Sequence, residues 1–257
     1  MPFVNPLLER WRQGEVVYSG WVSAPEPLTA NWLAACGFDE VLADLQHGAI
    51  EVGDLPTLFA AIESRGVAPA ARVPTNDPTV IGRALDMGAL SVMVPMVESG
   101  AEAARAVAAC RYAPAGTRSL GPLRPMTTFG TDDPAELAKV ACVVQVETAR
   151  GLANVDEIAS TPGLDAVFVG PGDLSLSLGL YEAGVSVPER DAGREAATAE
   201  IVAACQRHGV VAGIITSDGA AARRRVEEGF RLVALTSDLA LILEGGRREL
   251  ARAKGSA

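Results

Sequence analysis

Six polar side chains stand where short apolar runs of the sequence end, and their types suit chemistry on a carbonyl compound. They are Asp44, His47, Arg72, Gln145, Glu147 and Asp173. Glu147 and Asp173 end two successive runs, and two carboxylates that lie close together repel each other unless a cation separates them. Carboxylate oxygens suit Mg²⁺, Mn²⁺ or Co²⁺ better than zinc. The simpler alternative is that Glu147 pairs with Arg150 and that Asp173 caps the following helix.

His47 stands in the position of a general base, because it follows an apolar run and the ordinary pKa of histidine lies close to working pH. A nearby carboxylate would orient its ring, and Asp44 and Asp86 are the candidates. The second histidine, His208, precedes Gly209 at the end of a helix-like stretch, where it interacts well with the helix dipole. We therefore expect His47 to act in catalysis and His208 to be structural.

Arginine supplies nearly all of the positive charge, and this limits the chemistry. The chain has 22 basic residues, of which only Lys139 and Lys254 are lysines. Lys139 precedes an apolar run and Lys254 lies near the C-terminus, so neither is placed to form a Schiff base, and a metal ion has to activate the carbonyl group. Arg72 suits a carboxylate or a developing enolate because its fork binds two oxygens. A salt bridge with Asp44 or Asp77 is the alternative.

The elements that must position these residues follow from an alternation of apolar runs with Ala-, Glu- and Arg-rich stretches. Eight runs are rich in Val, Ile or Leu without strict alternation, as is typical of parallel strands buried on both faces. They cover residues 16–22, 40–45, 67–73, 91–96, 140–147, 165–170, 210–216 and 231–236. Helix-like stretches, most of which end at a glycine, cover 28–36, 54–65, 78–87, 101–110, 152–160, 189–208, 220–228 and 239–254.

Eight such units predict one α/β domain, a single (β/α)8 barrel that spans residues 1–257. The carboxyl ends of the strands and the loops after them would form the catalytic mouth. Segments 111–131 and 173–187 predict two long loops, and loops of that kind in compact domains are usually functional. The amphipathic stretch 239–254 is either the eighth barrel helix or a helix that packs on a neighbouring subunit.

Composition excludes several classes of function. Of 257 residues 49% are hydrophobic, and 22 basic against 32 acidic residues give a net charge of −10. Such a chain repels phosphate backbones and anionic lipids, so we expect no nucleic-acid or membrane partner. No apolar run approaches the ~20 residues that span a bilayer, and the N-terminus has no signal-peptide pattern. Four scattered cysteines without a CxxC pair predict reduced thiols in a cytoplasmic protein.

Five motifs, in one order along the chain, together resemble the HpcH/HpaI aldolase family of metal-dependent 2-oxoacid aldolases. They are Asp-Leu-Gln-His-Gly at 44–48, Val-Pro-Met-Val at 94–97, Arg-Tyr-Ala-Pro-Ala-Gly-Thr-Arg at 111–118, Gln-Val-Glu-Thr at 145–148 and Val-Gly-Pro-Gly-Asp-Leu-Ser at 169–175. The resemblance extends from about Gly20 to about Leu250. It implies a barrel that assembles as a hexamer, a trimer of dimers, whose paired subunits exchange the eighth helix.

The same resemblance assigns roles to residues at the mouth. Glu147 and Asp173 would hold a divalent cation, which is Mg²⁺, Mn²⁺ or Co²⁺. His47, supported by Asp86, would transfer protons either directly or through a metal-bound water. Arg72 would contact the keto oxygen or the enolate of the substrate.

The remaining substrate contacts are also implied by the resemblance. Gln145 would lie beside Arg72, and the backbone at Gly172 and Asp173 would receive the substrate carboxylate. Contacts on the aldehyde side depend on loops and on a neighbouring subunit, and the candidates are Trp21, Leu123, Arg124 and Ile215. Two departures stand out, because many relatives carry Glu at the position of Gln46 and Ala at the position of Gly172. Gln46 removes a negative charge near the base, but neither departure removes a metal ligand.

The implied reaction is the reversible aldol addition of a pyruvate or hydroxypyruvate enolate to an aldehyde. A carbon–carbon lyase that acts on a CoA thioester, of the citrate-lyase β-subunit type, is one alternative. It would need a basic groove for the CoA phosphates, to which Arg118 and Arg124 could contribute. A non-catalytic barrel that binds a 2-oxoacid is the other alternative, and it would not exchange the C3 protons of pyruvate.

Overall fold

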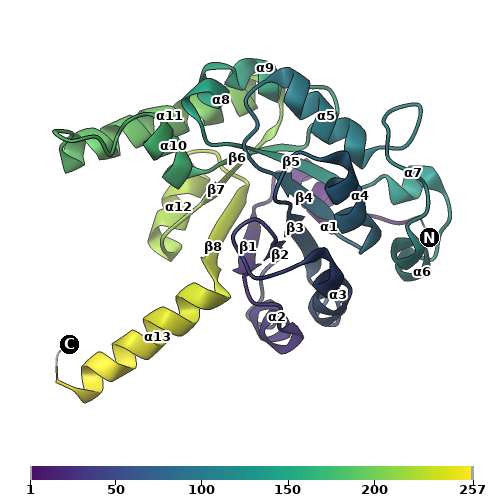
Figure 1. Cartoon of the computed structure of the whole chain (residues 1–257), viewed down its shortest axis with the longest axis horizontal. Helices are drawn as coiled ribbons and strands as arrows, with labels where there is room; N and C mark the ends of the chain where they lie inside the picture. Colours follow the sequence, from purple (N-terminus) through teal and green to yellow (C-terminus); the bar gives the residue numbers. More distant parts are fainter. Residues whose placement is uncertain (1, 256–257) are drawn as a thin grey trace.

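The polypeptide forms a closed barrel of eight parallel strands surrounded by helices (Figure 1). This computed structural model describes residues 2–255. The strands are β1 (Val17–Val22), β2 (Glu40–Asp44), β3 (Ala68–Arg72), β4 (Ser91–Val94), β5 (Ala141–Val146), β6 (Ala166–Val169), β7 (Val211–Ile215) and β8 (Leu232–Ser237). They follow one another in sequence order, and β8 pairs with β1. The predicted (β/α)8 barrel is confirmed, while the predicted domain ends at residues 1 and 257 lie outside the described residues.

Between successive strands, helices bring the chain back to the same end of the barrel, while one helix precedes β1 and one follows β8. They are α1 (Pro6–Arg12), α2 (Pro27–Ala34), η1 (Val52–Asp54), α3 (Leu55–Glu63), α4 (Pro78–Asp86), α5 (Gly100–Cys110), α6 (Leu123–Phe129), α7 (Pro134–Leu137), α8 (Ala149–Ala153), α9 (Val155–Ala159), α10 (Pro171–Ser177), α11 (Val187–His208), α12 (Gly219–Glu227) and α13 (Asp238–Ala253). No helix within residues 2–255 is both long and apolar enough to cross a membrane.

The two predicted loops are wrong in part, because segment 111–131 contains α6 and segment 173–187 begins inside α10. Both helices have only seven residues, which is too short for a helical period to show in the sequence. Pro125 is among the residues that suggest irregular structure in segment 111–131, and α10 likewise carries Pro171 in its first turn. Proline is nevertheless tolerated in a first helical turn, where the backbone N–H has no partner within the helix.

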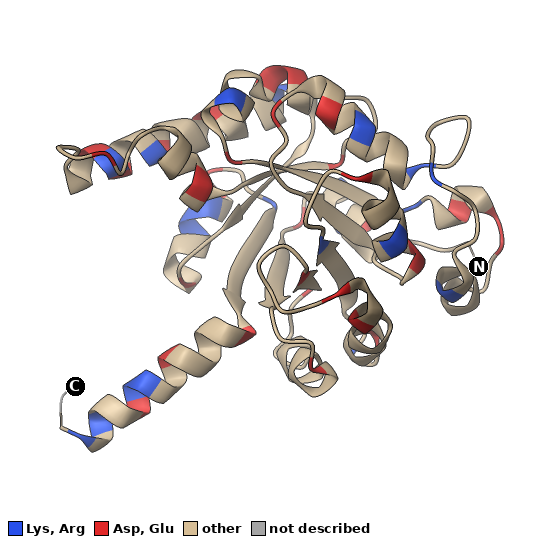
Figure 2. Ribbon diagram, in the orientation of Figure 1, with Lys and Arg blue, Asp and Glu red and all other residues tan. Residues whose placement is uncertain are grey.

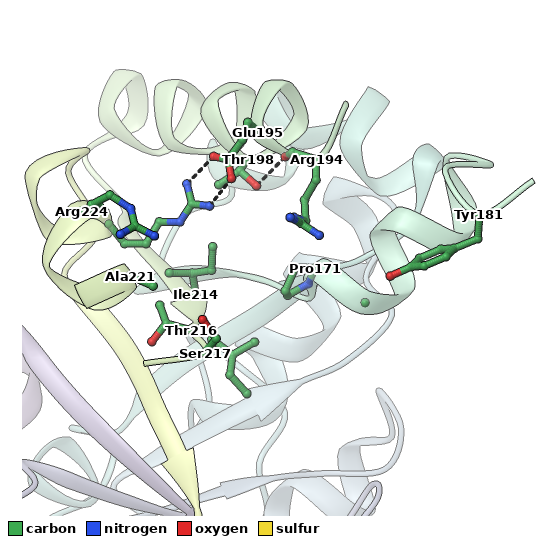
Figure 3. A pocket seen from close by; sticks show the side chains of 13 residues that line it. Pro171, Tyr181, Arg194, Glu195, Thr198, Ile214, Thr216, Ser217, Ala221 and Arg224 are labelled. Atoms are coloured by element: carbon green, nitrogen blue, oxygen red, sulfur yellow. Dashed lines mark hydrogen bonds and ion pairs between the residues drawn. The ribbon is translucent and has the colours of Figure 1, made fainter. Parts of the chain in front are cut away.

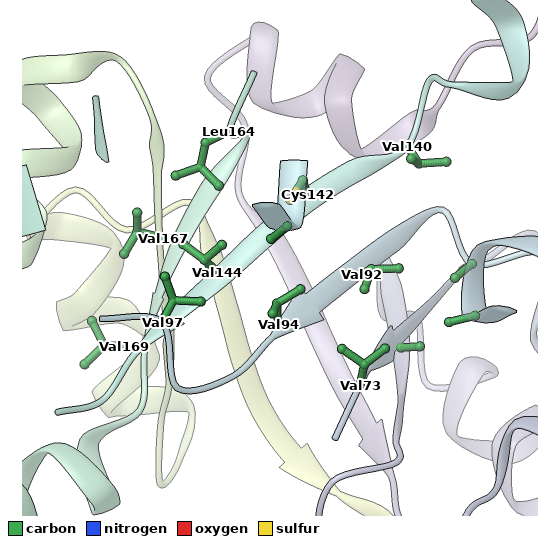
Figure 4. Close-up of a cluster of buried hydrophobic side chains, with 14 of the residues drawn as sticks. Val73, Val92, Val94, Val97, Val140, Cys142, Val144, Leu164, Val167 and Val169 are labelled. Atoms are coloured by element: carbon green, nitrogen blue, oxygen red, sulfur yellow. The ribbon is translucent and has the colours of Figure 1, made fainter. Parts of the chain in front are cut away.

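Two apolar layers stabilise the barrel. The inner layer fills the barrel with side chains such as those of Leu42, Met93 and Phe168. The outer layer lies between the strands and the helices, and Figure 4 shows Val94 and Val144 of neighbouring strands within it. Because the strands are covered on both faces, their sequences are mostly apolar, which explains why apolar and polar residues do not alternate along them.

Helix α1 closes the amino-terminal end of the barrel. Leu7 is buried in the inner layer, and the amide of Asn5 donates to the backbone carbonyls of Leu90 (2.8 Å) and Lys139 (2.9 Å). The Lys139 ammonium lies at this same end and donates to the carbonyl oxygen of Phe3 at 3.0 Å. The mouth therefore opens at the other end, and Lys139 lies far from it, as the sequence predicts.

The last helix, α13, projects away from the barrel instead of covering it (Figure 1). Its one buried residue within the described chain is Asp238. The carboxylate of Asp238 accepts hydrogen bonds from the backbone N–H groups of Ser23 (3.0 Å) and Ala24 (3.1 Å). The start of α13 is thus fixed to the loop after β1, while the rest of the helix is largely exposed.

Candidate active site

Strands β2 and β3 place Asp44 and Arg72 side by side at the mouth. The two residues end their strands and are partners in the strand register. The Arg72 guanidinium donates two hydrogen bonds to the Asp44 carboxylate, from Nε to Oδ1 at 2.9 Å and from Nη2 to Oδ2 at 2.7 Å. Both side chains are buried, and the guanidinium lies 4.5 Å from the centre of the Trp21 ring. Guanidinium has five N–H groups, so this salt bridge leaves donors for a ligand.

Asp44 also shapes the turn that carries His47. Its Oδ1 accepts hydrogen bonds from the backbone N–H groups of Gln46 (3.1 Å) and His47 (3.3 Å). A Cβ at Gly48 would overlap with the Asp44 carbonyl oxygen, so this close turn requires glycine. His47 is exposed beyond the end of β2. Its imidazole is therefore accessible to a substrate at the mouth.

Glu147 is a buried acid that follows β5, and its side chain is held on both oxygens. Oε1 accepts the backbone N–H of Met96 at 2.8 Å, and Oε2 accepts Nε2 of Gln145 at 2.5 Å. Met96 has φ of 56°, an unusual value for a residue other than glycine, and this strained backbone directs its N–H to the carboxylate. Burial raises the pKa of Glu147; the Met96 N–H opposes this shift, and the charge of Asp173 adds to it.

Asp173 lies in the first turn of α10, exposed at the mouth beside Glu147. The negative charge of Asp173 contributes to the raised pKa of Glu147, as expected of two carboxylates at the same mouth. Neither simpler alternative holds, because Arg150 pairs with Glu98 at 3.6 Å and α10 begins without a side-chain cap. Within residues 2–255, no group of three or more His, Cys, Asp and Glu side chains is placed to hold a metal ion.

This donor set fits a hard divalent cation that keeps most of its coordination positions for water and substrate. Mg²⁺ is typically bound by one or two protein carboxylates, and a cation would remove the repulsion between Glu147 and Asp173. The buried Oε1 of Gln145 has no hydrogen-bond partner among the described residues. A polar ligand beside Glu147 would satisfy this atom, so the residues present are compatible with a metal and its substrate.

The turn after β6 packs so closely against Glu147 that only glycine fits there. A Cβ at Gly170 would overlap with Oε2 of Glu147 and Nε2 of Gln145, whereas Gly172 faces open space. The sequence indicated this Gly-Pro-Gly segment for its accessible backbone, but not for the contact of Gly170 with the acid. Sequence reasoning also missed the N–H of Met96, for which the motif at 94–97 was the available signal.

Comparisons with known proteins decide the family. Residues 18–244 match the model of the HpcH/HpaI aldolase/citrate lyase family. The chain belongs to this family. It is 36% identical to a hydroxypyruvate/pyruvate aldolase of Rhizorhabdus wittichii (98% of this chain, 99% of the relative) and 36% identical to a 2-dehydro-3,6-dideoxy-6-sulfogluconate aldolase of Pseudomonas putida (91% of each). A crystal structure of a family member from Burkholderia cenocepacia superposes with a TM-score of 0.88 at 35% identity, covering 98% of this chain and 100% of that one.

Membership in the family confirms the resemblance seen in the sequence and makes the chain a carbon–carbon lyase of the aldolase type. In this aldolase Trp21 and Ile215 lie at the mouth. Trp21 is buried between Arg72 and Phe168, with 6.0 Å between the centres of the two aromatic rings. Ile215 ends β7 and is 36% exposed.

Within a single chain of this aldolase, three other predicted site residues lie at the end of the barrel away from the mouth. Asp86 ends α4, shortly before β4 begins, and pairs with Arg118 at 3.0 Å. Leu123 and Arg124 belong to α6, and Arg124 pairs with Glu63 at the end of α3. Because α3 and α4 run back from the mouth, their last residues are far from it. A single chain therefore does not bring Asp86, Leu123 or Arg124 to the mouth.

Proposed function

We propose that this aldolase depends on a divalent metal and reversibly joins the enolate of pyruvate or hydroxypyruvate to an aldehyde. The observation that carries the proposal is the placement of the buried Glu147 and the exposed Asp173 beside Arg72 at the mouth. The relative from Rhizorhabdus wittichii is named for hydroxypyruvate and pyruvate, which supports the choice of 2-oxoacid. Mg²⁺, Mn²⁺ and Co²⁺ all suit the oxygen ligands.

The residues at the mouth divide the work of this reaction. Glu147 and Asp173 would hold the cation, which when bound supplies a Lewis acid for the keto and carboxylate oxygens of the substrate. Arg72, fixed by Asp44, would stabilise the negative charge that develops on the keto oxygen. The exposed backbone at Gly172 is open to the substrate carboxylate.

His47 would take the proton from C3 of the 2-oxoacid and return one on cleavage. The Asp44 carboxylate holds the turn that carries His47, which fixes the backbone position from which the imidazole extends. The predicted support from Asp86 requires a second copy of the chain, because the length of the barrel separates Asp86 from His47 within one copy.

The structure gives no support to a lyase acting on CoA thioesters at the two arginines predicted for it. The Arg118 side chain is 2% exposed and pairs with Asp86, and Arg124 pairs with Glu63. Both guanidinium groups are already paired with carboxylates, so neither offers an unpaired charge for the CoA phosphates.

Exchange of the C3 protons of pyruvate in D₂O, followed by NMR, tests the proposal without an aldehyde. We expect exchange with Mg²⁺, Mn²⁺ or Co²⁺, its loss in EDTA, and rates lower by about 100-fold or more in Glu147→Gln and Asp173→Asn. Asp191→Asn, which changes an exposed acid on α11, is the matched control. Full exchange by folded, EDTA-treated protein would exclude the metal, and no exchange in the native protein would leave a non-catalytic binder.

We also propose a homo-oligomer, a hexamer built as a trimer of dimers, in which paired subunits exchange α13. The helix exposes four apolar side chains close to its start, Leu239, Leu241, Ile242 and Leu243. On α2, Leu28 and Trp32 are 58% and 64% exposed, and an apolar cleft lies between Trp32 and Ile242. The same helix from a second copy would cover these surfaces.

A further inference from the structure

A cleft of about 360 Å³ lies between α11 and α12, outside the barrel wall and next to the mouth (Figure 3). Its floor is β7, where Ile214 belongs to the outer apolar layer. Gly172 and Ser217, which follow β6 and β7, line its end toward the mouth. Gly172 and Ile215, at the border with the mouth, are the only lining residues that the proposed aldol reaction uses.

Arginines from both helices line the cleft (Figure 3), and Figure 2 shows basic segments in blue on α11 and α12. Arg225 is already paired with two acids, since it donates to Glu195 at 2.6 and 2.7 Å and to Glu228 at 2.7 Å. The Arg225 hydrogen bond lowers the pKa of Glu195, so this acid in the lining is ionised and already paired. Arg225 and Glu195 therefore form a bridge between the helices and leave the other two arginines to determine the charge of the cleft.

Arg194 and Arg224 face the cleft from opposite walls (Figure 3). Arg194 makes one hydrogen bond, of 2.7 Å, to Asp191 on its own helix, and the Asp191 side chain is 53% exposed. Exposed pairs of this kind contribute little, so an anion in the cleft competes well for Arg194. Arg224 has no ion pair with any other residue in the range 2–255. The lining thus holds two guanidinium groups with capacity for a further anion.

We propose that this cleft is a binding site for a small anion, a phosphate, sulfonate or carboxylate group held between Arg194 and Arg224. Guanidinium forks match the oxygens of these groups and bind them with charge-assisted hydrogen bonds. The volume is at the small end of the range for ligand sites, which suits a small anion or a short anionic chain. The net charge of −10 repels anions at long range, so these two arginines must provide the local attraction.

The anion has two possible sources, a separate ligand or the charged tail of a substrate in the mouth, because Gly172 borders both the cleft and the site of Asp173. The first experiment measures binding of inorganic phosphate by calorimetry, at low ionic strength, with metal and pyruvate present so that the mouth is occupied. We expect Arg194→Gln and Arg224→Gln each to raise the Kd about 10-fold or more. Arg207→Gln, a surface variant on α11 whose partner is Asp156, should leave the Kd within about twofold.

The second experiment compares kcat/KM for glyceraldehyde 3-phosphate and for glyceraldehyde in the same variants. A lower preference for the phosphorylated aldehyde in Arg194→Gln and Arg224→Gln would identify a substrate tail. An unchanged preference with weaker phosphate binding would identify a separate ligand. The proposal is overturned if the Kd for phosphate and the preference for the phosphorylated aldehyde both stay at the native values in Arg194→Gln and Arg224→Gln. C3 proton exchange of pyruvate should be normal in both, so failure of the aldolase proposal would be seen separately in the native protein.

Discussion

At the scale of single residues, the most unusual group is Glu40, an acid inside the barrel and far from the chemistry. It begins β2 and is 1% exposed, next to the hydroxyl groups of Ser19 and Ser91. Burial raises the pKa of Glu40 to about 7, and the two hydroxyls only partly oppose the shift. The residue is therefore largely protonated in the folded protein below neutral pH.

Glu40 makes the stability of the protein depend on pH. In the unfolded chain its pKa is near 4.5, so the unfolded state loses the proton first as pH rises, and stability falls between pH 4.5 and about 7. The full effect is roughly 3 kcal/mol. We expect the free energy of unfolding of Glu40→Gln, measured in urea, to rise by roughly 2 kcal/mol relative to that of the native protein as the pH goes from 5 to 8. Glu200→Gln, an exposed change on α11, should show no such gain. If the free energy of unfolding changes with pH in the same way in Glu40→Gln and in the native protein, the raised pKa of Glu40 is contradicted.

Residue types and positions at strand ends were enough to indicate Asp44, Arg72, Glu147 and Asp173, because parallel strands bring their carboxyl ends to one mouth. The sequence left open whether Arg72 pairs with Asp44, and the register of β2 and β3 decides this. The left-handed backbone of Met96 could not be predicted. It depends on a contact between Met96, which follows β4, and Glu147, which follows the neighbouring strand β5.

At the scale of elements, strands and long helices were predictable and short helices were not. A buried parallel strand has a continuous apolar run, and a helix such as α11 combines a capping box at Ser186 with a left-handed Gly209 at its end. Helices α1, α6, α7 and α10 have at most seven residues, so they are specified by packing and caps rather than by a period. His208 does end α11, where it contacts Asp156 at 3.1 Å, as expected of a structural histidine.

The connection from β6 to α10 offers a matched pair of glycines that tests how this element positions the proposed metal ligands, Glu147 and Asp173. Gly170 has φ of −95°, which other residues adopt readily, so its glycine is required by contact with Glu147 and Gln145 rather than by the backbone. We expect Gly170→Ala to weaken Mn²⁺ binding about 10-fold or more, because the displaced carboxylate no longer meets Asp173. Gly172→Ala adds a Cβ in open space and should leave Mn²⁺ affinity within about threefold. Equal affinities of the two variants in calorimetry would contradict the proposal that Gly170 holds Glu147 in place for the metal.

At the scale of the whole molecule, one chain carries two incomplete features that a second copy would complete. Helix α13 leaves its apolar side chains exposed, and Asp86 and Leu123 lie at the end of the barrel away from the mouth. An exchange of α13 between copies would bury its apolar side chains. A neighbouring copy would bring its own Asp86 and Leu123 to the mouth. Assembly and activity are then expected to be linked.

A charge on α13 tests this link. In a symmetric pair the same contact occurs twice, so Ile242→Asp places two carboxylates in the proposed apolar interface at once, where an unpaired charge is costly. We expect the native protein to sediment as a hexamer of 26.6 kDa chains and Ile242→Asp to sediment as smaller, folded species. Glu244→Gln, two residues further along the same helix, should keep the native mass. Aldol cleavage should fall together with assembly, because the proposed support of His47 by Asp86 would have to come from another copy. A folded monomer that keeps the native cleavage rate would show instead that one chain contains the complete site.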